Sequence, residues 1–594
     1  MAVGNNMRAP YSDGAADSSS FPLPGGPGAR TLMIQGTGSS AGKSLLVTGL
    51  CRLFREEGFR VAPFKGQNMS LNSYPAADGG EIGRAQVVQA EAAGLAPSVH
   101  MNPVLLKPTS ERGSQVIVHG RPIGHMKAYS YHGRKGRLRD AVQESLDYLR
   151  ARYELVVIEG AGSPAEINLR ENDIVNMGVA RLCGAPVLLV ADIERGGVFA
   201  SLYGTWALLG DEDRRLLRGF IVNKFRGDSS ILEPGLRELE ERTGMRCAGV
   251  VPYLEHLHID AEDSVSLQNG SARTCGDIRP VVSVIHLPRI SNFTDFHSLE
   301  ASGLFEIRYV SHPEELDDAS LVVLPGTKST VSDLEELRHR GFEQALVECR
   351  SRGVPVLGIC GGFQMLGERI LDAQRVESHE TEVPGLGLLP MTTTFVSQKI
   401  TEPVRLRSAG GGDDTHGSNA GGWWPHQIQG EGYEIHMGTS QVRKEHDEGG
   451  AGDVGGGGRC GPLLEIATER EESTEDTDSG GHPYRPEGLA TADGLVAGTY
   501  VHGLFDDFSV IAALARKLGI TESRIDNSWA QWTERHEAKE AAYDRLAGAL
   551  RSHLDMDFIR SLVAEQKAGT EEAAEADAER AGAAGENTKR GWTE

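Results

Sequence analysis

The sequence predicts an α/β protein made of two successive units, each built around a parallel sheet. Short apolar runs alternate with segments of helical length, a pattern typical of parallel strands joined by crossover helices. The alternation stops at residues 271–280, where polar, glycine and proline residues predict a linker, and then resumes. In both units an apolar run continues through glycine into a helix. We therefore expect one domain over residues 30–270 and a second over residues 281–510.

The first unit is predicted from a series of apolar strands. It begins with "TLMIQ" from Thr31, followed by a glycine loop and a helix with Leu46, Leu50 and Leu53 on one face. The later strands are expected at "FRVAPF", "YELVVIEG", "APVLLVAD", "LRGFIVNKF" and "AGVVPYL". The segments between them are long enough for helices, so the unit is expected to be a parallel sheet with crossover connections.

The second unit is predicted in the same way. It begins at "VVSVIHLPRI" and continues with "ASLVVLPGTKS" and two helical stretches. The segment "VPVLGICGGFQML" then runs from strand through glycine into helix, and a last strand is expected at "LVAGTYVHGLF". The two units share this architecture and no sequence motif.

Four segments are expected to lie outside the two sheets. Residues 1–29 are rich in glycine, proline and serine and predict a disordered extension. Residues 408–485 are glycine-rich and acidic and are interpreted as surface insertions that bury little. Helical spacing is present over residues 511–565, whereas residues 566–594 have few apolar residues and predict a frayed tail.

Composition excludes several classes of protein. The formal net charge of -24 argues against nucleic-acid binding, because neutralising phosphates requires a concentrated basic surface. The seven cysteines show no CxxC spacing, which favours a reducing compartment and therefore the cytoplasm. No apolar run reaches the roughly 20 residues that span a bilayer, so no membrane association is expected. The oligomeric state stays open.

The loop "GTGSSAGKS" at residues 36–44 predicts a phosphate site of P-loop NTPase type. A strand that passes through glycine into a helix presents backbone N–H groups and the positive end of the helix to an anion. Lysine would add a mobile charge, and serine would offer its hydroxyl to Mg²⁺. The upstream glycine lies one position further away than in the usual pattern. The candidate nucleotide-binding residues are Gly36, Thr37, Gly38, Gly42, Lys43 and Ser44.

The longer spacing resembles that of the dethiobiotin-synthetase-like ATPases. Members of that family activate a carboxylate as an acyl phosphate for attack by nitrogen, so the resemblance implies ATP and ligation. Glu159, at the end of "LVVI", lies where open α/β sheets bind ligands and is a candidate Mg²⁺ ligand with Ser44. The resemblance also implies that Asn223, at another strand end, reads adenine.

Cys360 lies between glycines in "GICGGF", at a predicted turn from strand to helix. This is the cysteine counterpart of a nucleophile elbow, and the following helix end favours the thiolate. The backbone N–H groups of Gly361 and of Gly326, in the "PGTKS" loop, are candidates for an oxyanion hole. His502, in "TYVHGLF", is the preferred base, and His436 is a competing candidate.

This cysteine elbow with a distant histidine resembles the class I glutamine amidotransferases, which have a flavodoxin-like fold. The resemblance implies hydrolysis of L-glutamine through a thioester, with ammonia passed onward. In that family a glutamate usually stands two residues after the histidine, where this chain has Leu504. We therefore expect a dyad of Cys360 and His502, steadied by a backbone acceptor or by Glu434.

Longer motifs resemble the cobyric acid synthase family over about residues 30–565. They include "FKGQNMSLNSY", "DGGEIGRAQ", "MNPVLLKP", "EGAGSPAEINLRENDIVNMGVA" and "DIERGGVFASLYGT". The resemblance implies amidation of corrinoid carboxylates with ATP, Mg²⁺ and glutamine. An enzyme that amidates the a and c carboxylates shares both domains and is the nearest alternative. A partition-type ATPase switch is a more distant one, and it would leave Cys360 unexplained.

A substrate with several carboxylates calls for cationic and amide side chains. Such residues follow the loop helix, and the candidates for corrinoid contact are Lys65, Gln67, Asn68, Asn72, Lys107 and Arg112. Asp78 is a third candidate for Mg²⁺. Asp78 and Glu81 are alternatively candidates for positioning ammonia, and their spacing does not separate these roles.

Overall fold

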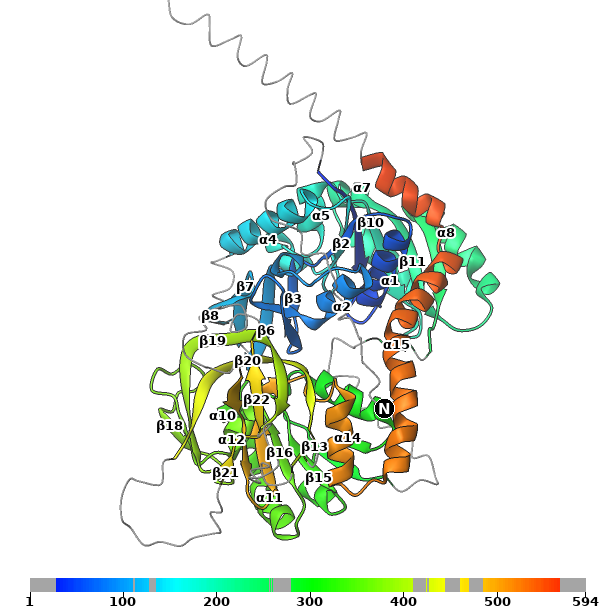
Figure 1. Ribbon diagram of the computed structural model, residues 1–594. Helices are drawn as coiled ribbons and strands as arrows, with labels where there is room; N and C mark the ends of the chain where they lie inside the picture. The colour runs from blue at the N-terminus through cyan, green and yellow to red at the C-terminus, as the bar shows by residue number, and fades with distance from the viewer. Residues whose placement is uncertain are drawn as a thin grey trace, which may run out of the picture.

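The computed structural model describes residues 28–110, 113–127, 135–255, 257, 259, 279–409, 423–424, 427–443, 460–468 and 484–566. Most of the expected extension at 1–29, of the linker at 271–280 and of the tail at 566–594 lies outside these residues. The described residues form two α/β units, drawn one above the other in Figure 1, and a long helix runs beside both.

The first unit contains the predicted parallel sheet, which confirms the fold class. In spatial order its strands are β12 (Arg246–Pro252), β11 (Leu217–Phe225), β10 (Val187–Asp192), β1 (Arg30–Gly36), β9 (Leu155–Glu159) and β2 (Val61–Phe64). Strand β1 is central, because Met33 pairs with both Val187 and Ile158 in parallel register. The helices of this unit are α1 (Lys43–Glu56), α2 (Arg84–Ala92), α4 (Lys135–Arg150), α5 (Met177–Cys183), α6 (Val198–Leu208), α7 (Asp211–Leu216) and α8 (Glu233–Thr243).

A smaller sheet follows β2 and was not expected from the sequence. Its strands are β3 (Gln67–Met69), β6 (Val104–Ser110), β7 (Gly113–Val118) and β8 (Arg121–Lys127), with a nearby hairpin of β4 (Ser73–Pro75) and β5 (Glu81–Gly83). The hairpin contacts strands β19 (Met391–Ser408) and β20 (Gln429–Val442) of the second unit. In Figure 1 these strands lie between the parallel sheet and the lower unit. Segments expected to bind substrate therefore form the interface between the units.

The second unit has its own, largely parallel sheet. In spatial order its strands are β14 (Glu306–Val310), β13 (Val281–Ile285), β15 (Leu321–Leu324), β16 (Val356–Ile359), β25 (Val496–Thr499), β24 (Leu489–Thr491) and β21 (Cys460–Gly461). Its helices are α9 (His297–Ser302), α10 (Thr330–His339), α11 (Phe342–Ser351), α12 (Gly361–Leu366) and α14 (Phe508–Lys517). The strands that precede the expected elbow and the expected histidine, β16 and β25, are neighbours. This pairing brings the two candidate residues to the same edge of the sheet.

A second, mixed sheet packs in the same unit. Its strands are β18 (Glu382–Pro384), β17 (Arg369–Leu371), β19 (Met391–Ser408), β20 (Gln429–Val442), β26 (Val501–His502), β22 (Leu464–Ala467) and β23 (Arg485–Glu487). The described residues of both units also form short 3-10 helices. They are η1 (Val99–Met101), η3 (Ile167–Asn172), η4 (Ser229–Leu232), η6 (Phe293–Phe296) and η7 (Pro313–Leu316).

The interpretation of residues 408–485 as surface insertions that bury little was wrong for much of this segment. Strands β20 and β22 lie within it, and Trp423, Tyr433 and Ile466 are buried. Alternating apolar residues in "GYEIHMG" and two adjacent tryptophans were outweighed by the surrounding glycine. Residues 410–422 and 444–459, which hold most of the glycine-rich sequence, lie outside the described residues.

The long helix α15 (Glu522–His553) connects the two units. It packs on α9 and α14 at its start and on α1 and β12 further along, as Figure 1 shows in orange and red. Leu546 and Leu550 of α15 lie against Gly49 of α1, where a Cβ would be 2.5 Å from Leu550. The expected helical segment at 511–565 is thus part of both cores: its start packs in the second unit, and its later part, with Leu546 and Leu550, packs in the first. None of the described helices combines the length and apolar character needed to cross a membrane.

Candidate functional site

The loop between β1 and α1 has the geometry of a phosphate site. The N–H of Thr37 donates to the Val190 carbonyl (2.8 Å), which fixes the start of the loop on β10. Gly42 is the N-cap of α1 with φ 95°, and a Cβ there would lie 2.1 Å from Nδ2 of Asn223. Only glycine adopts this left-handed backbone conformation without strain and also fits in the space left by Asn223. The glycine of the Gly-Lys-Ser motif is therefore structurally required.

Lys43 folds back over this loop. Its Nζ donates to the carbonyls of Gly38 (2.8 Å) and Gly162 (3.2 Å), and its side chain is buried. A Cβ at Gly36 would lie 2.9 Å from the same nitrogen, so the upstream glycine leaves room for the ammonium. The loop thus combines a buried cation with the positive end of α1. This combination fits a phosphate group.

Ser44 and Glu159 meet beneath the loop, as a shared metal site would require. The Ser44 hydroxyl donates to Oε1 of Glu159 (2.8 Å), and Nζ of Lys65 donates to the same oxygen (2.9 Å). Nε2 of Gln89 donates to Oε2 (2.5 Å). Burial alone would raise the pKa of Glu159, but the charge of Lys65 and the hydrogen bonds from Lys65, Gln89 and Ser44 together outweigh it, so the pKa lies below the ordinary value. A hydroxyl beside an ionised carboxylate is a set of hard oxygen ligands that fits Mg²⁺.

Asn223 supports the phosphate loop from β11. Its Nδ2 donates to the Ala41 carbonyl (2.9 Å), and Nζ of the next residue, Lys224, donates to the Ser40 carbonyl (2.8 Å). Lys224 has φ 62° and is also paired with Asp192 (2.8 Å). The structure therefore gives Asn223 a role in holding the loop, which the sequence did not indicate. Adenine recognition by Asn223 stays a prediction.

The residues expected to contact substrate are found mostly in buried contacts within the protein. Lys65 is paired with Glu159, as described above. Nζ of Lys107 forms an ion pair with Oε1 of Glu81 (2.5 Å), and both side chains are buried. Both lysines are thus paired within the protein, and their contact with substrate carboxylates stays a prediction. A buried lysine needs a charge partner, and the protein supplies one for each.

The amide candidates lie in the same interface region. Asn68, on β3, is buried and its Nδ2 donates to Oε1 of Gln86 (3.0 Å). Asn72 is buried just before β4, and Gln67 is half-buried at the start of β3. Arg112 lies outside the described residues.

Asp78 does not lie in the Mg²⁺ site, so this prediction is corrected. Its carboxylate accepts hydrogen bonds from the Ser98 hydroxyl (2.6 Å) and from the N–H of Val99 (3.1 Å). It thereby caps the start of η1, on an exposed turn. The carboxylate is used to satisfy free backbone donors at a helix start, a common role of aspartate.

Cys360 forms the expected elbow between β16 and α12. It is the N-cap of α12 with φ 51° and ψ -108°, a strained conformation for a residue that carries a Cβ. Its N–H donates to the Thr499 carbonyl on β25 (2.8 Å), and its Sγ approaches the Ile435 carbonyl (3.6 Å). A Cβ at Gly362 would lie 2.1 Å from the Leu324 carbonyl oxygen. The flanking glycine therefore makes the sharp turn possible and the thiol is projected from it.

His502 lies beside Cys360 and is oriented by Asp295. Nδ1 of His502 is 2.7 Å from Oδ2 of Asp295, whose Oδ1 accepts from the N–H of Gly503 (3.0 Å). Burial alone would lower the pKa of His502, but the charges of Asp295 and of Cys360, which shares a hydrogen bond with the ring, raise the pKa to about 10. The three side chains form a Cys-His-Asp arrangement, so the expected simple dyad was wrong.

The other proposed partners of His502 have different roles. Glu434 binds Arg485 (2.6 Å) and lies 3.7 Å from Nε2 of His436, so it does not steady His502. Nδ1 of His436 is 3.0 Å from the Gly438 carbonyl, and its ring stacks on Tyr500. Leu504 is buried at the position of the missing glutamate. Asp295 replaces that glutamate from a different part of the chain.

The two glycines proposed for an oxyanion hole border the same centre. A Cβ at Gly326 would lie 2.9 Å from Cε1 of His502, and one at Gly361 would lie 2.7 Å from Cγ2 of Thr327. Both positions are therefore close to the Cys360 turn and tolerate no side chain. Their N–H groups as oxyanion donors stay a prediction.

Cys360 lines a cavity of about 50 Å³ that reaches both units. The cavity is bordered by Gln364, Lys328, Glu377 and Lys399 from the second unit and by Lys107 from the first. Burial raises the pKa of Glu377 to about 7 and lowers the pKa of Lys399 to about 8. The thiol therefore opens into a small charged cavity and is accessible for chemistry.

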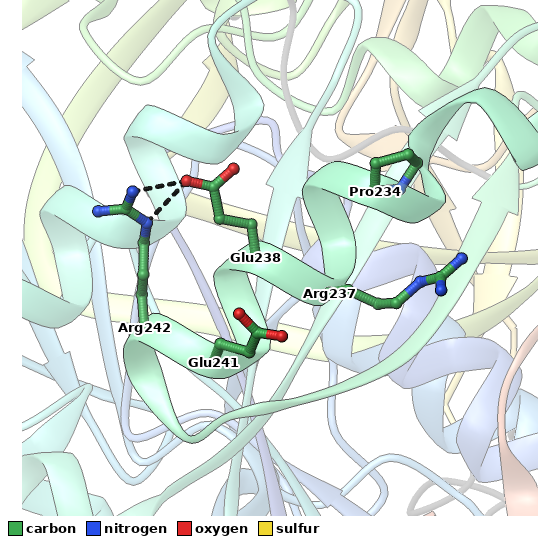
Figure 2. Close-up of a pocket in the computed structure, with 5 residues that line it drawn as sticks. All are labelled: Pro234, Arg237, Glu238, Glu241 and Arg242. Carbon is green, nitrogen blue, oxygen red and sulfur yellow. Dashed lines mark hydrogen bonds and ion pairs between the residues drawn. The ribbon is translucent and has the colours of Figure 1, made fainter.

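A larger hollow lies on the outer face of α8, away from these residues. Figure 2 shows that it is bordered by charged side chains of one helix, with Arg242 bound to Glu238 (2.6 Å). Arg237 is paired with Glu233 at 2.9 Å. These are exposed pairs one helical turn apart, so the hollow is the solvated face of a helix.

Comparisons with known proteins agree with this geometry. A family model described as a CobQ/CobB/MinD/ParA nucleotide binding domain matches residues 32–267, and one described as a CobB/CobQ-like glutamine amidotransferase domain matches residues 281–510. PurLQS from Thermotoga maritima, a solved structure, is 19% identical with a TM-score of 0.26, over 43% of this chain and 100% of that chain.

Relatives match nearly the whole chain. The cobyric acid synthase of Pelotomaculum thermopropionicum is 47% identical over 543 residues, which is 90% of this chain and 97% of that protein. The cobyric acid synthase of Desulforudis audaxviator is 51% identical over 499 residues, which is 83% of this chain and 92% of that protein. With this identity and coverage, and with both domains matched in order, the chain belongs to the cobyric acid synthase family.

Proposed function

We propose that this chain uses ATP and glutamine to amidate the b, d, e and g carboxylates of cobyrinic acid a,c-diamide, with or without the adenosyl group. The observation that carries the proposal is the presence, in one chain, of a phosphate loop beside an ionised Glu159 and a Cys360–His502–Asp295 arrangement. One site prepares a carboxylate for ligation, and the other releases nitrogen. The names of the relatives support the corrinoid substrate.

In the second unit, Cys360 attacks the side-chain carbonyl carbon of glutamine. His502, whose pKa is raised to about 10, holds the proton that comes from the thiol, and Asp295 stabilises this imidazolium. His502 then gives this proton to the departing nitrogen, ammonia leaves, and a thioester to Cys360 remains. Water hydrolyses the thioester to glutamate. The N–H groups of Gly361 and Gly326 would stabilise the oxyanion of each tetrahedral intermediate.

In the first unit, the loop amides and Lys43 bind the phosphates of ATP and stabilise transfer of the γ-phosphoryl group to a substrate carboxylate. Ser44 and Glu159 would hold Mg²⁺, which neutralises phosphate charge when bound. Lys65 keeps Glu159 ionised and oriented until then. Ammonia attacks the acyl phosphate, an amide forms and phosphate leaves. The seven cysteines without CxxC spacing support a cytoplasmic location for this reaction.

Mass spectrometry of the product tests the proposal. The protein is incubated with ATP, Mg²⁺, glutamine and cobyrinic acid a,c-diamide, and the corrinoid is followed over time. Four successive mass steps, each of one carboxylate converted to an amide, are expected. Parallel reactions with cobyrinic acid address the alternative that the a and c carboxylates are the targets. Conversion of cobyrinic acid to its diamide, with no change in the a,c-diamide, would replace the proposal by that alternative.

A further inference from the structure

A buried set of polar residues joins the two units at the wall of the Cys360 cavity. From the first unit it contains Ser73 on β4, Glu81 on β5 and Lys107 on β6. From the second unit it contains Asn292, just before η6, and Lys399 on β19. All five are nearly inaccessible to solvent or fully buried. We call these five residues the junction. Charged and polar groups at such a depth require complete pairing.

Glu81 is the charged centre of the junction and is 0% exposed. Its Oε1 accepts from Nζ of Lys107 (2.5 Å) and from the Ser73 hydroxyl (2.6 Å). Its Oε2 binds Nζ of Lys399 in the other unit. Burial alone would raise the pKa of Glu81, but the two lysines lower the pKa far below its ordinary value. One carboxylate thus bridges both units and is ionised.

Lys399, which binds Glu81, directly follows an irregularity in β19. Thr394 pairs with Thr439 and Lys399 with Met437, so several residues of β19 bulge against a single residue of β20. Bulges redirect side chains and are often placed beside functional sites. Directly after this bulge, Lys399 contacts the first unit through Glu81 and lines the cavity wall.

Asn292 connects the junction to the glutaminase site. Its Oδ1 accepts from the N–H of Ser73 (3.2 Å), and its Nδ2 donates to the Ser73 carbonyl (3.2 Å) and to the Tyr433 hydroxyl (3.1 Å). The ring of Tyr433 stacks on that of His502, with centroids 5.5 Å apart. Asn292 has φ 52° and lies three residues before Asp295. The backbone of Ser73 is therefore fixed to the segment that orients the catalytic histidine.

Two junction residues, Lys107 and Lys399, line the cavity into which Cys360 opens. Ammonia released at Cys360 meets these cationic side chains on its way to the first unit. With Lys328, the described wall of this cavity carries three lysines against one carboxylate, that of Glu377. An excess of positive charge repels ammonium and has no such effect on neutral ammonia, the nucleophile that ligation needs. If the Glu81 bridge opened, the wall between the units would lose its central contact.

From this geometry we infer that Glu81, clamped between Lys107 and Lys399, is a positioning residue that seals the cavity between the units so that ammonia is delivered rather than lost. The inference rests on the proposed function and adds a residue pair to it. The carboxylate touches no reacting atom, and it acts by holding Lys107, Lys399 and Ser73 in register. Its loss would separate glutamine hydrolysis from amidation without disabling either site.

The test measures glutamate formed per amide formed. In the wild-type chain this ratio should be about one. Glu81→Gln keeps the shape and removes the charge, so the ratio is expected to rise at least threefold while amidation with added ammonium chloride stays within about twofold. Lys399→Met should produce a similar rise. Because both variants break the same bridge, the double variant should be no worse than either single one.

A matched control breaks an ion pair away from the junction, between α15 and α1 of the first unit. Arg52 of α1 pairs with Glu540 (2.8 Å) and Asp544 (2.6 Å) of α15 at the surface, and Arg52→Ala should leave the ratio at one. If Glu81→Gln does not fold, Asn292→Gly replaces it, because glycine keeps the positive φ and removes the amide clamp. An unchanged ratio in the folded variant, or equal losses with both nitrogen sources, would overturn the inference. A wild-type chain that forms no amide would count against the proposed function instead.

Discussion

Two turns of the same architecture serve different chemistry in this chain. Gly42 and Cys360 are each the N-cap of a helix that follows a buried parallel strand, and both have positive φ, at 95° and 51°. Neither helix receives a capping hydrogen bond from a side chain at this position: Gly42 has no side chain, and that of Cys360 makes no such bond. In the proposed function the backbone and Lys43 bind phosphate at the first turn, so a glycine suffices. At the second turn the proposed nucleophile is the cap side chain itself, so a Cβ is required.

The difference shows where each turn stores strain. Gly42 adopts its conformation freely, whereas Cys360 adopts one that costs a residue with a Cβ roughly 1–3 kcal/mol. At the second turn glycine is required after the cap residue and not at it, because Gly362 lies against the Leu324 carbonyl. Strain is therefore found where a side chain must be projected, and it is avoided where the backbone does the binding. The predictions below separate these two functions.

Lys43→Ala should have the largest effect, because activation of the carboxylate precedes attack by nitrogen from either source. Loss of the buried ammonium should lower amidation about 10²- to 10³-fold, with glutamine and with ammonium chloride alike. Steady-state amide formation measures this. Lys539→Ala, which removes a partly exposed lysine of α15 paired with Glu91 of α2, is the control and should change little. Normal activity of Lys43→Ala with ammonia would exclude a role in phosphate transfer.

Cys360→Ala should affect only one nitrogen source. Without the thiol no thioester forms, so glutamine-supported amidation should fall at least about 10³-fold, while ammonia-supported amidation stays within about twofold. Both rates are measured on the same preparation. Cys247→Ala, at a partly buried cysteine of β12, should retain both activities. Equal loss with both nitrogen sources would contradict the division of labour between the two turns.

Much of this fold follows from local patterns that are visible in the sequence. Strand, glycine and helix are adjacent in sequence at both turns, so Lys43 and Cys360 were identified from neighbours within a few residues. Glu159 and His502 end apolar runs, and carboxyl ends of parallel strands meet at one edge of a sheet. These signals do not depend on long-range contacts.

Asp295 was missed because its partner is distant. It lies 207 residues from His502, and no spacing rule connects them. Phenylalanines on both sides of it, at 293 and 296, were a sign that this acidic residue is buried. The pairing of Lys65 and Lys107 was also missed, because a sequence shows charge and not pairing. Their partners, Glu159 and Glu81, lie on other strands.

Asp295→Asn should impair the second turn less severely than loss of its thiol. The amide can bind His502 but cannot stabilise the imidazolium, so glutamine hydrolysis should fall about 10²-fold with ammonia-supported amidation retained. Glutamate release measures this effect. A loss below about twofold would show that His502 needs no carboxylate.

The same variant should change how stability depends on pH. Burial alone would lower the pKa of His502, but the pKa is raised from 6.5 to about 10, chiefly by the charge of Asp295. A raised pKa stabilises the folded state fully below the ordinary value of 6.5, and this contribution is lost as the pH rises through about 10. The denaturant midpoint of Asp295→Asn should thus lie furthest below that of the wild type at about pH 6 and approach it near pH 10. A difference that does not vary with pH would disprove the coupling.

The smallest expected effect isolates the strain at the elbow. At most buried positions glycine is less stable than alanine by about 0.5–1 kcal/mol. At Cys360 the order should reverse, because φ 51° and ψ -108° is open to glycine and strained for alanine, and Cys360→Gly should exceed Cys360→Ala by about 1 kcal/mol in free energy of unfolding. Denaturant titration compares the two inactive variants, with Ala512→Gly on the buried face of α14 as a control in which glycine destabilises. Equal or lower stability of Cys360→Gly would mean that the turn carries no strain, and the contrast with Gly42 would then be one of chemistry alone.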